Sequence, residues 1–536
     1  MSRTLSASSA LELSGDGLTL ADAERLLHGE IDALRFAPAA RKRVERSRRV
    51  VMGLLDNDET IYGVNTGFGK LANQRIAPHE VLALQENLLR SHAVGMGALL
   101  PLGVARLAFA LRIQALAKGY SGVTPELIDA LIAVYNRGVV PAIPEQGSVG
   151  ASGDLAPLAH LALVVIGEGH AFVRKPGAER PARGYPDAAA GRRPKPVSGR
   201  AALRRVHLPP YRLQAKEGLA LINGTQISTA LLADALVRAW HLARVADVTA
   251  AMTLEATRSS VRPFDPRIQQ VRLHPGQVAS AANVRRLLEG SEIIPSHADC
   301  GKVQDAYSIR CVPQVHGTLR DALTFITAVV EREMNAATDN PLVFADTGEI
   351  LSGGNFHAQP IALASDLLAA AVTDLSSISE RRTENLVNPD LSGLPGFLTP
   401  HAGLNSGMMI VQVLAAALVS ENKGLSFPAS VDSIPTSANR EDHVSMAPAA
   451  ARKARSVVTN ATRVLAAEVL CAAQGLEFRQ GLRPGKGAEA AYAHVREHVR
   501  PLGRDRTLHR DLEAVERLIR TGSLLAAVEA ARGTLE

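Results

Sequence analysis

The sequence predicts a mainly α-helical fold, in which a bundle of long helices is joined to a smaller N-terminal region that carries the candidate site, with few short strands. Alanine and leucine prevail over β-branched residues, and aromatic residues make up only 4% of the 536 residues. Both features favour helix over strand. Apolar residues recur three and four positions apart in four long runs, which indicates helices at residues 104–118, 213–259, 358–386 and 438–474.

The length and the 46% of apolar residues allow a large core and roughly two to four compact units. We expect an N-terminal region at residues 1–215 and a long-helix bundle with a C-terminal helical region at residues 216–536. The second long run is interrupted near Asn223 and Gly224. The apolar faces of helices of this length need more surface to pack against than one small domain offers. Neighbouring subunits are therefore expected to complete the bundle.

The net charge of +6 is concentrated in one stretch. Residues 174–212 hold eleven Lys and Arg side chains against Glu179 and Asp187, so the rest of the chain is slightly acidic. This stretch is rich in Pro, Gly and Arg and poor in apolar residues, which predicts a surface loop or mobile insertion. The distribution argues against a nucleic-acid-binding face, although a polyanion contact at this stretch remains an alternative.

The cysteines and the apolar segments indicate a cytoplasmic protein. Cys300, Cys311 and Cys471 form no CxxC pair and leave one thiol over, which suits a reducing compartment. His297 lies close to Cys300, but two such ligands without a second pair predict no metal site. The N-terminus lacks the apolar segment of a signal peptide, and the apolar run at residues 408–419 is too short to cross a bilayer.

Loops dense in Gly, Asn, Ser and Pro lie between the predicted helices, at residues 62–69, 147–155, 352–357 and 388–407. Such loops gather at helix ends in a bundle and often carry sites. The first loop is not a Walker A phosphate-binding loop, because Val64 stands where that pattern needs glycine and Leu71 where it needs Ser or Thr. Tyr62, at its start, can act as a base where its pKa is lowered.

The loop at residues 147–155, GSVGASGDL, has two interpretations that hold together. Asp154 is expected to cap a core helix at residues 155–166, which ends at glycines. Ahead of it, the Gly153 nitrogen can close on the Ala151 carbonyl carbon, because glycine has no Cβ to obstruct the approach. Loss of water from that ring and of the Ser152 hydroxyl leaves an exocyclic methylene, which is an electrophile.

The Ala-Ser-Gly tripeptide and the motifs around it resemble the aromatic amino acid ammonia-lyases. The matching motifs follow the family order from about residue 61 to the C-terminus: YGVNTGFGKLANQRI, LQENLLRSHAVGMG, KEGLALINGTQ, KVQDAYSIRC, SGGNFHAQPIA, SGLPGFLTPHAGLNSG and SVDSIPTSANREDHVSM. The resemblance implies that Ala151, Ser152 and Gly153 form 4-methylidene-imidazol-5-one autocatalytically, so that no diffusible cofactor is needed. It also implies a homotetramer whose active sites are shared between subunits, and it assigns Tyr62 as the base that removes the β-proton.

Further roles follow from the same resemblance. Arg310 is expected to bind the substrate carboxylate, with a hydrogen bond added by Asn223, and the guanidinium suits this task because its donors form a rigid fork. Gln304 and Tyr307 precede Arg310 at intervals of three, which places them on one side of a helical turn. Tyr307 is expected to contact the amino group and the ring, with Gln304 nearby. Phe356 is expected to pack beside the ring.

The predicted substrate depends on two positions. His92 can hydrogen-bond a polar ring, but tyrosine-specific relatives share this residue. Glu441 discriminates better, because a carboxylate accepts an imidazole N–H and the phenylalanine-type relatives have an amide there. The expected reaction therefore converts L-histidine to trans-urocanate and ammonia. A tyrosine lyase or aminomutase and an inactive helical scaffold remain alternatives.

Overall fold

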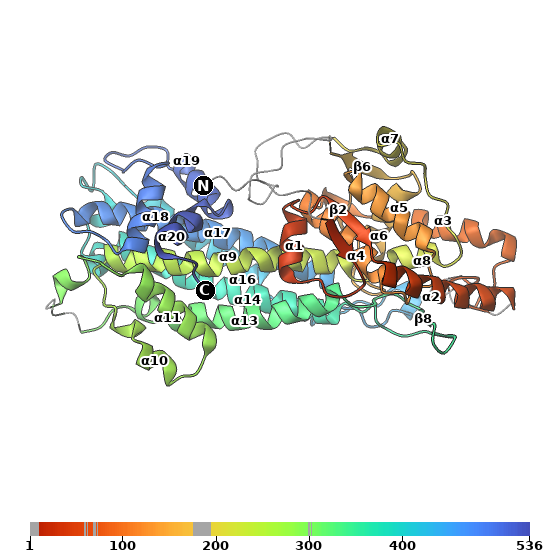
Figure 1. Cartoon of the computed structure of the whole chain (residues 1–536). Helices are drawn as coiled ribbons and strands as arrows, with labels where there is room; N and C mark the ends of the chain where they lie inside the picture. Colours follow the sequence, from red (N-terminus) through yellow and green to blue (C-terminus); the bar gives the residue numbers. More distant parts are fainter. Residues whose placement is uncertain are drawn as a thin grey trace. The chain divides into compact units, whose positions relative to one another are not determined.

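The computed structural model describes residues 10–57, 60, 61, 63–67, 71, 73–174, 195–298, 301 and 303–536 (Figure 1). Over these residues the chain is mainly helical with short strands, as predicted. It forms two compact units from interleaved segments: unit 1 has residues 1–234, 327–365 and 428–452, and unit 2 has residues 235–326, 366–427 and 453–536. The division into regions 1–215 and 216–536 stays a prediction.

Unit 1 holds the short sheets of the described residues. One pair is parallel and the others are antiparallel. The sheets are β1 (Ala10–Leu13) with β2 (Ala33–Phe36), β3 (Met96–Leu99) with β5 (Pro144–Gln146), β6 (His170–Val173) between β4 (Val139–Pro141) and β7 (Val197–Ser198), and β8 (Leu342–Phe344) with β9 (Glu349–Leu351).

Several α-helices lie wholly within unit 1. They are α1 (Leu20–Leu27), α2 (Pro38–Asp56), α3 (Val81–His92), α4 (Leu102–Ala117), α5 (Pro125–Asn136), α6 (Leu155–Val165), α7 (Gly199–Arg205) and α8 (Glu217–Ile222). In α4 every residue after Leu102 is buried, including Arg106 and Arg112. A helix that is buried on all sides forms the centre of a core.

Four long helices carry residues of both units, because the unit boundaries fall inside them. These are α9 (Gln226–Ala256), α13 (Val312–Met334), α14 (Gln359–Val387) and α17 (Ala447–Leu476). The shorter helices of unit 2 are α10 (Pro266–Gln270), α11 (Pro275–Leu287), α12 (Tyr307–Arg310), α15 (Pro389–Ser392), α16 (Met409–Leu425), α18 (Lys486–Arg496), α19 (His509–Arg520) and α20 (Ser523–Arg532).

The four predicted long runs are helical, and two begin several residues later than expected: the second begins at Glu217 and not at residue 213, and the fourth begins at Ala447 and not at residue 438. The interruption near Asn223 is confirmed, since α8 ends at Ile222 and α9 begins at Gln226. The prediction for residues 438–446 is wrong: Ala438 and Met446 have φ values of 53° and 57°, which an α-helix cannot contain. These residues form a turn that presents Glu441 to a cavity.

The basic stretch at residues 174–212 is a loop only in part. Residues 175–194 lie outside the described residues. Beyond them, β7 pairs with β6 and α7 follows directly, so the prediction of a loop is wrong for residues 197–205. Ser198 accepts a hydrogen bond from the Ala201 N–H and caps α7, which explains how a helix forms in so basic a segment.

Buried charges tie the long helices together within unit 2. Asp247 on α9 accepts from Arg320 at 2.5 Å and contacts His316 Nδ1 at 2.8 Å, both on α13. Arg382 on α14 donates to Glu468 on α17 at 2.6 and 2.9 Å. Burial raises the pKa of Asp247, but Arg320 and His316 outweigh it and hold that pKa at about 2. Such pairs orient the helices, and loss of one partner leaves a buried charge.

Within the part of the chain that the structure describes, two helices are long and apolar enough to cross a membrane by length and composition, namely Gln359–Val387 and Ala447–Arg479. Buried residues make up 61% and 83% of their apolar windows. Packing inside the protein therefore accounts for their apolar character without a membrane.

Replacing Glu255 by glutamine is expected to stabilise the protein at alkaline pH. Glu255 is buried in unit 2, where it accepts from the Gly485 N–H at 2.7 Å and the Ser291 hydroxyl at 3.0 Å. Burial raises its pKa from 4.5 to about 7, so its contribution to stability is present below pH 4.5 and lost as the pH rises to about 7. The neutral amide avoids that loss, which amounts to about 3 kcal/mol.

The thermal midpoints of wild type and Glu255→Gln, measured between pH 5 and 8, check this expectation. The thermal midpoint of Glu255→Gln should increase relative to that of wild type as the pH rises. Glu489→Gln, at an exposed position on α18, should show no such trend. A constant difference across the range would contradict the role of burial.

Candidate active site

A cavity of about 760 Å³ lies within unit 1. It is lined by α3, the start of α6, the end of α8 and residues outside the α-helices, which are Gly67, Leu71, Gln74, Ile76, Asn340, Ser352, Gly353, Phe356, Ser437 and Glu441. The predicted site residues on its wall are His92, Ser152, Asn223, Phe356 and Glu441. Its volume suits a small molecule.

The turn between α8 and α9 fixes one edge of the Ala151-Ser152-Gly153 segment. Gly153 forms a parallel bridge with Gly224, and Asp154 donates its N–H to the Gly224 carbonyl at 2.7 Å. The φ of Gly153 is +68°, and a Cβ on it would lie 2.2 Å from the Gly224 oxygen. Glycine alone fits both this left-handed backbone and this close approach.

Residues 444–446 hold the other edge of the segment. The Ser445 hydroxyl donates to the Gly150 carbonyl at 2.9 Å, although the two residues are 295 positions apart. The Met446 N–H donates to the Val149 carbonyl at 2.8 Å. Ala151 packs against Met446 and Val444 in a small apolar cluster. The tripeptide is therefore clamped between two distant parts of the chain.

Asp154 does not cap α6 with its side chain, so that part of the prediction is wrong. It stands at the N-cap position, but its carboxylate makes no capping hydrogen bond to α6. Instead, the carboxylate accepts from the Ser228 hydroxyl at 2.7 Å and the Ser228 N–H at 2.8 Å, in the first turn of α9. Burial raises the pKa of Asp154 to about 6, although the hydrogen bonds from Ser228 oppose the rise.

Ser152 is contacted from two sides. Its hydroxyl donates to Glu441 Oε1 at 3.2 Å, and its carbonyl accepts from Asn223 Nδ2 at 3.2 Å. The second carboxylate oxygen of Glu441 accepts from the Thr436 hydroxyl, and residues 436 and 441 also form a backbone bridge. Glu441 is therefore held by its own turn with its carboxylate toward the serine.

Arg112 supports Asn223 from the core, and sequence reasoning missed it. Its NH1 donates to the Asn223 carbonyl at 2.7 Å and to Gln226 Oε1 at 3.1 Å. Burial lowers the pKa of Arg112 to about 10, so the guanidinium stays charged at neutral pH. The signal in the sequence is an arginine within the apolar run AFALRIQALA, where a charged side chain needs a buried partner.

His92 is the last residue of α3 and lines the cavity. Its Nδ1 lies 2.9 Å from the Leu88 carbonyl, which can only accept, so Nδ1 carries the proton and Nε2 is an acceptor in the neutral ring. Burial lowers the pKa of His92, although the Leu88 carbonyl and the charge of Glu441 act in the opposite direction. The ring is therefore neutral at pH 7.

Phe356 belongs to a loop that Asn340 positions. Asn340 Oδ1 accepts from the Gly353 N–H at 2.7 Å and the Ser352 hydroxyl at 3.2 Å, and all four residues line the cavity. Sequence reasoning identified Phe356 but not Asn340. Asn340 precedes the β8–β9 hairpin and contacts Ser352 and Gly353, which follow the hairpin 12 and 13 positions further along the chain.

The other predicted residues are not on the described wall of this cavity. Gln304, Tyr307 and Arg310 belong to unit 2. The Arg310 guanidinium lies 4.4 Å from the centroid of the Tyr307 ring, so the predicted sharing of one face holds for this pair. Gln304 precedes α12 and is exposed to solvent. Tyr307 is 70% exposed. Tyr62 lies outside the described residues.

Gly153→Ala is expected to destabilise unit 1 and to block ring closure at the tripeptide. The new Cβ meets the Gly224 oxygen, and the left-handed backbone alone costs an L-residue about 1–2 kcal/mol. Gly348→Ala is a matched control, because its φ is +74° but no atom lies within 4 Å of the added Cβ. Thermal unfolding and the mass of the chain check the two effects. An equal decrease in thermal stability in Gly153→Ala and Gly348→Ala would contradict the role of the Gly224 contact.

Comparisons with known proteins agree on one family. Residues 18–497 match the model of the aromatic amino acid lyases. A histidine ammonia-lyase from Anaeromyxobacter sp. (strain K) is 57% identical over 516 residues, which cover 96% of this chain and 99% of that protein. The structure of histidine ammonia-lyase from Trypanosoma cruzi is 42% identical, with a TM-score of 0.87 and coverage of 98% and 96%. Tyrosine aminomutase from Streptomyces globisporus is 35% identical, with a TM-score of 0.90 and coverage of 98% and 100%.

Proposed function

Because the chain belongs to the aromatic amino acid lyase family, we propose that it acts as a histidine ammonia-lyase, which converts L-histidine to trans-urocanate and ammonia in the first step of histidine degradation. The observation that carries the proposal is the carboxylate of Glu441 on the cavity wall, 3.2 Å from the Ser152 hydroxyl. A carboxylate accepts the N–H of an imidazole, whereas a phenyl ring offers no such donor. The names of the relatives at 57% and 42% identity support the same substrate.

Ammonia is hard to eliminate from an α-amino acid, because the amine is a poor leaving group and the β-proton is weakly acidic. We propose that Ala151, Ser152 and Gly153 lose two water molecules and become 4-methylidene-imidazol-5-one, without a diffusible cofactor. This group supplies an electrophile that takes up electrons from the substrate. The local structure suits it, because Gly153 has no Cβ and the serine hydroxyl faces the cavity carboxylate of Glu441.

Asn223 supports the chemistry at Ser152. Its amide donates to the Ser152 carbonyl oxygen, and a fixed donor at such an oxygen stabilises negative charge that develops on it. Arg112 keeps Asn223 in place through its carbonyl. The Asn223 Oδ1 is buried and has no hydrogen-bond partner among the described residues.

The remaining roles in the proposal follow the family resemblance. Tyr62 removes the β-proton, and Arg310 binds the substrate carboxylate. Tyr307 contacts the amino group and the ring, with Gln304 beside it. Phe356 limits access of water. His92 contributes the neutral acceptor nitrogen that its hydrogen bond to Leu88 leaves free for the substrate ring.

We further propose a cytoplasmic homotetramer whose subunits complete one another's sites, with no nucleic-acid or membrane partner. Tyr307 is exposed beside Arg310 and is thus available to the cavity of another copy. Helix α16 exposes Ile410, Val413 and Leu414 by 65%, 51% and 37%. Their spacing places them on one face of the helix, and exposed apolar faces of this kind mark contacts between subunits.

A tyrosine aminomutase is the second candidate, because the structure of that name from Streptomyces globisporus has a TM-score of 0.90 to this chain. Its 35% identity is lower than the 57% and 42% of the histidine ammonia-lyases. Both activities would use the same electrophile, so the substrate separates them.

The test is incubation of the full-length protein with L-histidine, L-tyrosine and L-phenylalanine, with product formation followed by ultraviolet absorbance. We expect L-histidine to react about 100-fold faster than L-phenylalanine, because a site built to bind a substrate donor discriminates strongly against an analogue without one. We also expect it to react faster than L-tyrosine, whose donor is a phenol O–H in place of an imidazole N–H. Conjugated product from L-tyrosine but not from L-histidine would overturn the substrate assignment. No product from any of the three, with the protein folded and tetrameric, would overturn the enzyme assignment.

A further inference from the structure

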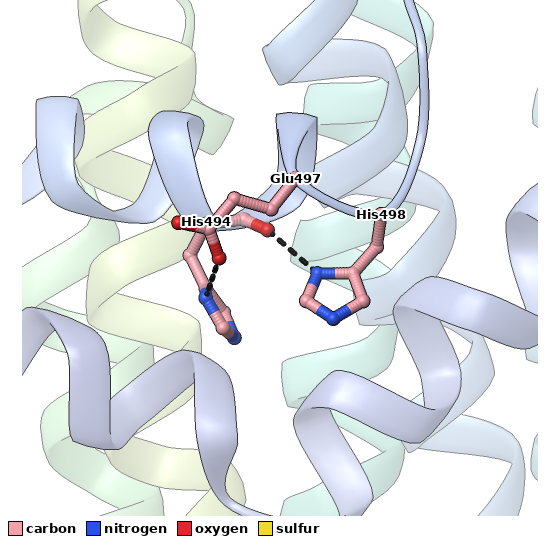
Figure 2. A group of neighbouring side chains, drawn as sticks. All are labelled: His494, Glu497 and His498. Carbon is pink, nitrogen blue, oxygen red and sulfur yellow. Dashed lines mark hydrogen bonds and ion pairs between the residues drawn. The ribbon is translucent and has the colours of Figure 1, made fainter.

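Two imidazoles and a carboxylate gather at the C-terminal end of α18 in unit 2. They belong to His494, Glu497 and His498, within the run HVREH, and Figure 2 shows them at the helix end. One ligand atom of each side chain lies within 4.8 Å of those of the other two. Spacings of three and four along a helical turn place the side chains on one face.

Both rings are oriented by hydrogen bonds, which Figure 2 marks as dashed lines for His494 with Glu497 and for His498. His498 Nδ1 lies 3.0 Å from the His494 carbonyl, so it carries a proton and leaves the Nε2 lone pair available. His494 Nδ1 lies 3.0 Å from Glu497 Oε2, and its Nε2 lies 3.2 Å from the Ser523 hydroxyl at the start of α20. Histidines that bind metals typically have a second ring nitrogen fixed in this way.

The surroundings favour a cation. The C-terminal end of a helix carries partial negative charge, and Glu497 stands at the C-cap position of α18. The one cationic side chain within the run, Arg496, is engaged elsewhere: its Nε donates to Glu477 at 2.7 Å. Glu497 and His498 are exposed to solvent, while His494 is only 18% exposed and anchors the group.

We propose that His494, Glu497 and His498 form a binding site for a divalent transition metal, with Zn²⁺ as the preferred ion. Two imidazoles and one carboxylate are a common Zn²⁺ ligand set, and water fills the fourth tetrahedral position. Imidazole ligands select Zn²⁺, Ni²⁺ or Cu²⁺ over Mg²⁺ and Ca²⁺. The site lies in unit 2 and shares no residue with the described wall of the cavity in unit 1, and it does not depend on the proposed function.

The test is equilibrium dialysis of the full-length protein, first stripped with EDTA, against ZnCl₂. We expect wild type to bind one more Zn²⁺ per chain than His498→Ala, and Glu497→Gln to weaken that binding about tenfold or more. His509→Ala is the matched control: His509 is 74% exposed and pairs with Glu513 at 3.3 Å four residues on, so it resembles the site, but the described residues offer it no third ligand. This control should bind as wild type does.

Co²⁺ provides a second measurement, because its visible absorption reports the geometry and ligands of the bound ion. Wild type and His509→Ala should show the same absorption, and His498→Ala should lose it. All variants are checked for native circular dichroism and oligomer size. Equal Zn²⁺ stoichiometry and affinity in wild type and His498→Ala would overturn the proposal, as would no Zn²⁺ binding by wild type. Tighter binding of Mg²⁺ than of Zn²⁺ would overturn the assigned metal class.

Discussion

Ser152→Ala is expected to reduce turnover of L-histidine by about a thousandfold or more, the scale of loss when a group that carries the chemistry is removed. Without the hydroxyl there is no group to leave from Cβ, so the methylene cannot form. The fold should survive, because the side chain makes one hydrogen bond, to Glu441 at 3.2 Å, and such a bond contributes about 1 kcal/mol.

Initial rates from urocanate absorbance and the intact mass of the chain check this expectation together. The wild-type chain should be lighter than its sequence by two water molecules, and the variant should not show that loss. Ser352→Ala is the matched control, since Ser352 also lines the cavity but contacts Asn340. Its rate should stay within about tenfold of wild type, as for loss of one hydrogen bond. An unmodified wild-type mass would contradict the proposed ring.

Glu441→Gln is expected to lower kcat/KM for L-histidine by about 100-fold or more, the scale of a lost acid, base or charged acceptor. The carboxylate accepts from the Thr436 hydroxyl within its own turn, so it keeps its place on the cavity wall after the Ser152 hydroxyl has left. Glutamine keeps the shape but removes the charge and turns one acceptor into a donor.

Asp442→Asn is the control for Glu441→Gln, because Asp442 is the neighbouring carboxylate, is exposed and is not among the described residues that line the cavity. It should leave kcat/KM nearly unchanged. Intact mass separates the two roles of Glu441: a variant chain that has lost two waters but turns over poorly identifies a role toward the substrate. A chain with full loss of water and wild-type turnover would contradict that role.

The local spacing of apolar residues was enough to predict those helices that are stabilised by packing of their own apolar faces. The helix predicted at residues 104–118 is α4, and the break near Asn223 separates α8 from α9. Local pattern failed at residues 438–446, where helical spacing gives way to a turn in which Ala438 and Met446 have positive φ. That turn is stabilised by contacts of Met446 with Val149, far earlier in the chain, which no window of sequence contains.

The family motifs were enough to predict which side chains belong to the site. They were not enough where the position of a side chain depends on a partner that is distant in the sequence. His92, Asn223 and Glu441 do line one cavity with Ser152. Asp154 caps α9 rather than α6. The prediction missed this because the partner of Asp154, Ser228, lies 74 residues further along the chain. The metal-ligand pattern at residues 494–498 was open to sequence reasoning, which considered only the cysteines and His297.

The contact between Gly153 and Gly224 has a consequence for the order of events after synthesis. The backbone conformation of the tripeptide is imposed by the α8–α9 turn and by Ser445, so it exists only in a chain that has folded around both. A nascent chain that ends before Ser445 lacks one of the two clamps. The proposed loss of two waters should therefore follow folding of unit 1, and the mass of the chain would then record covalently whether each molecule has reached its native fold.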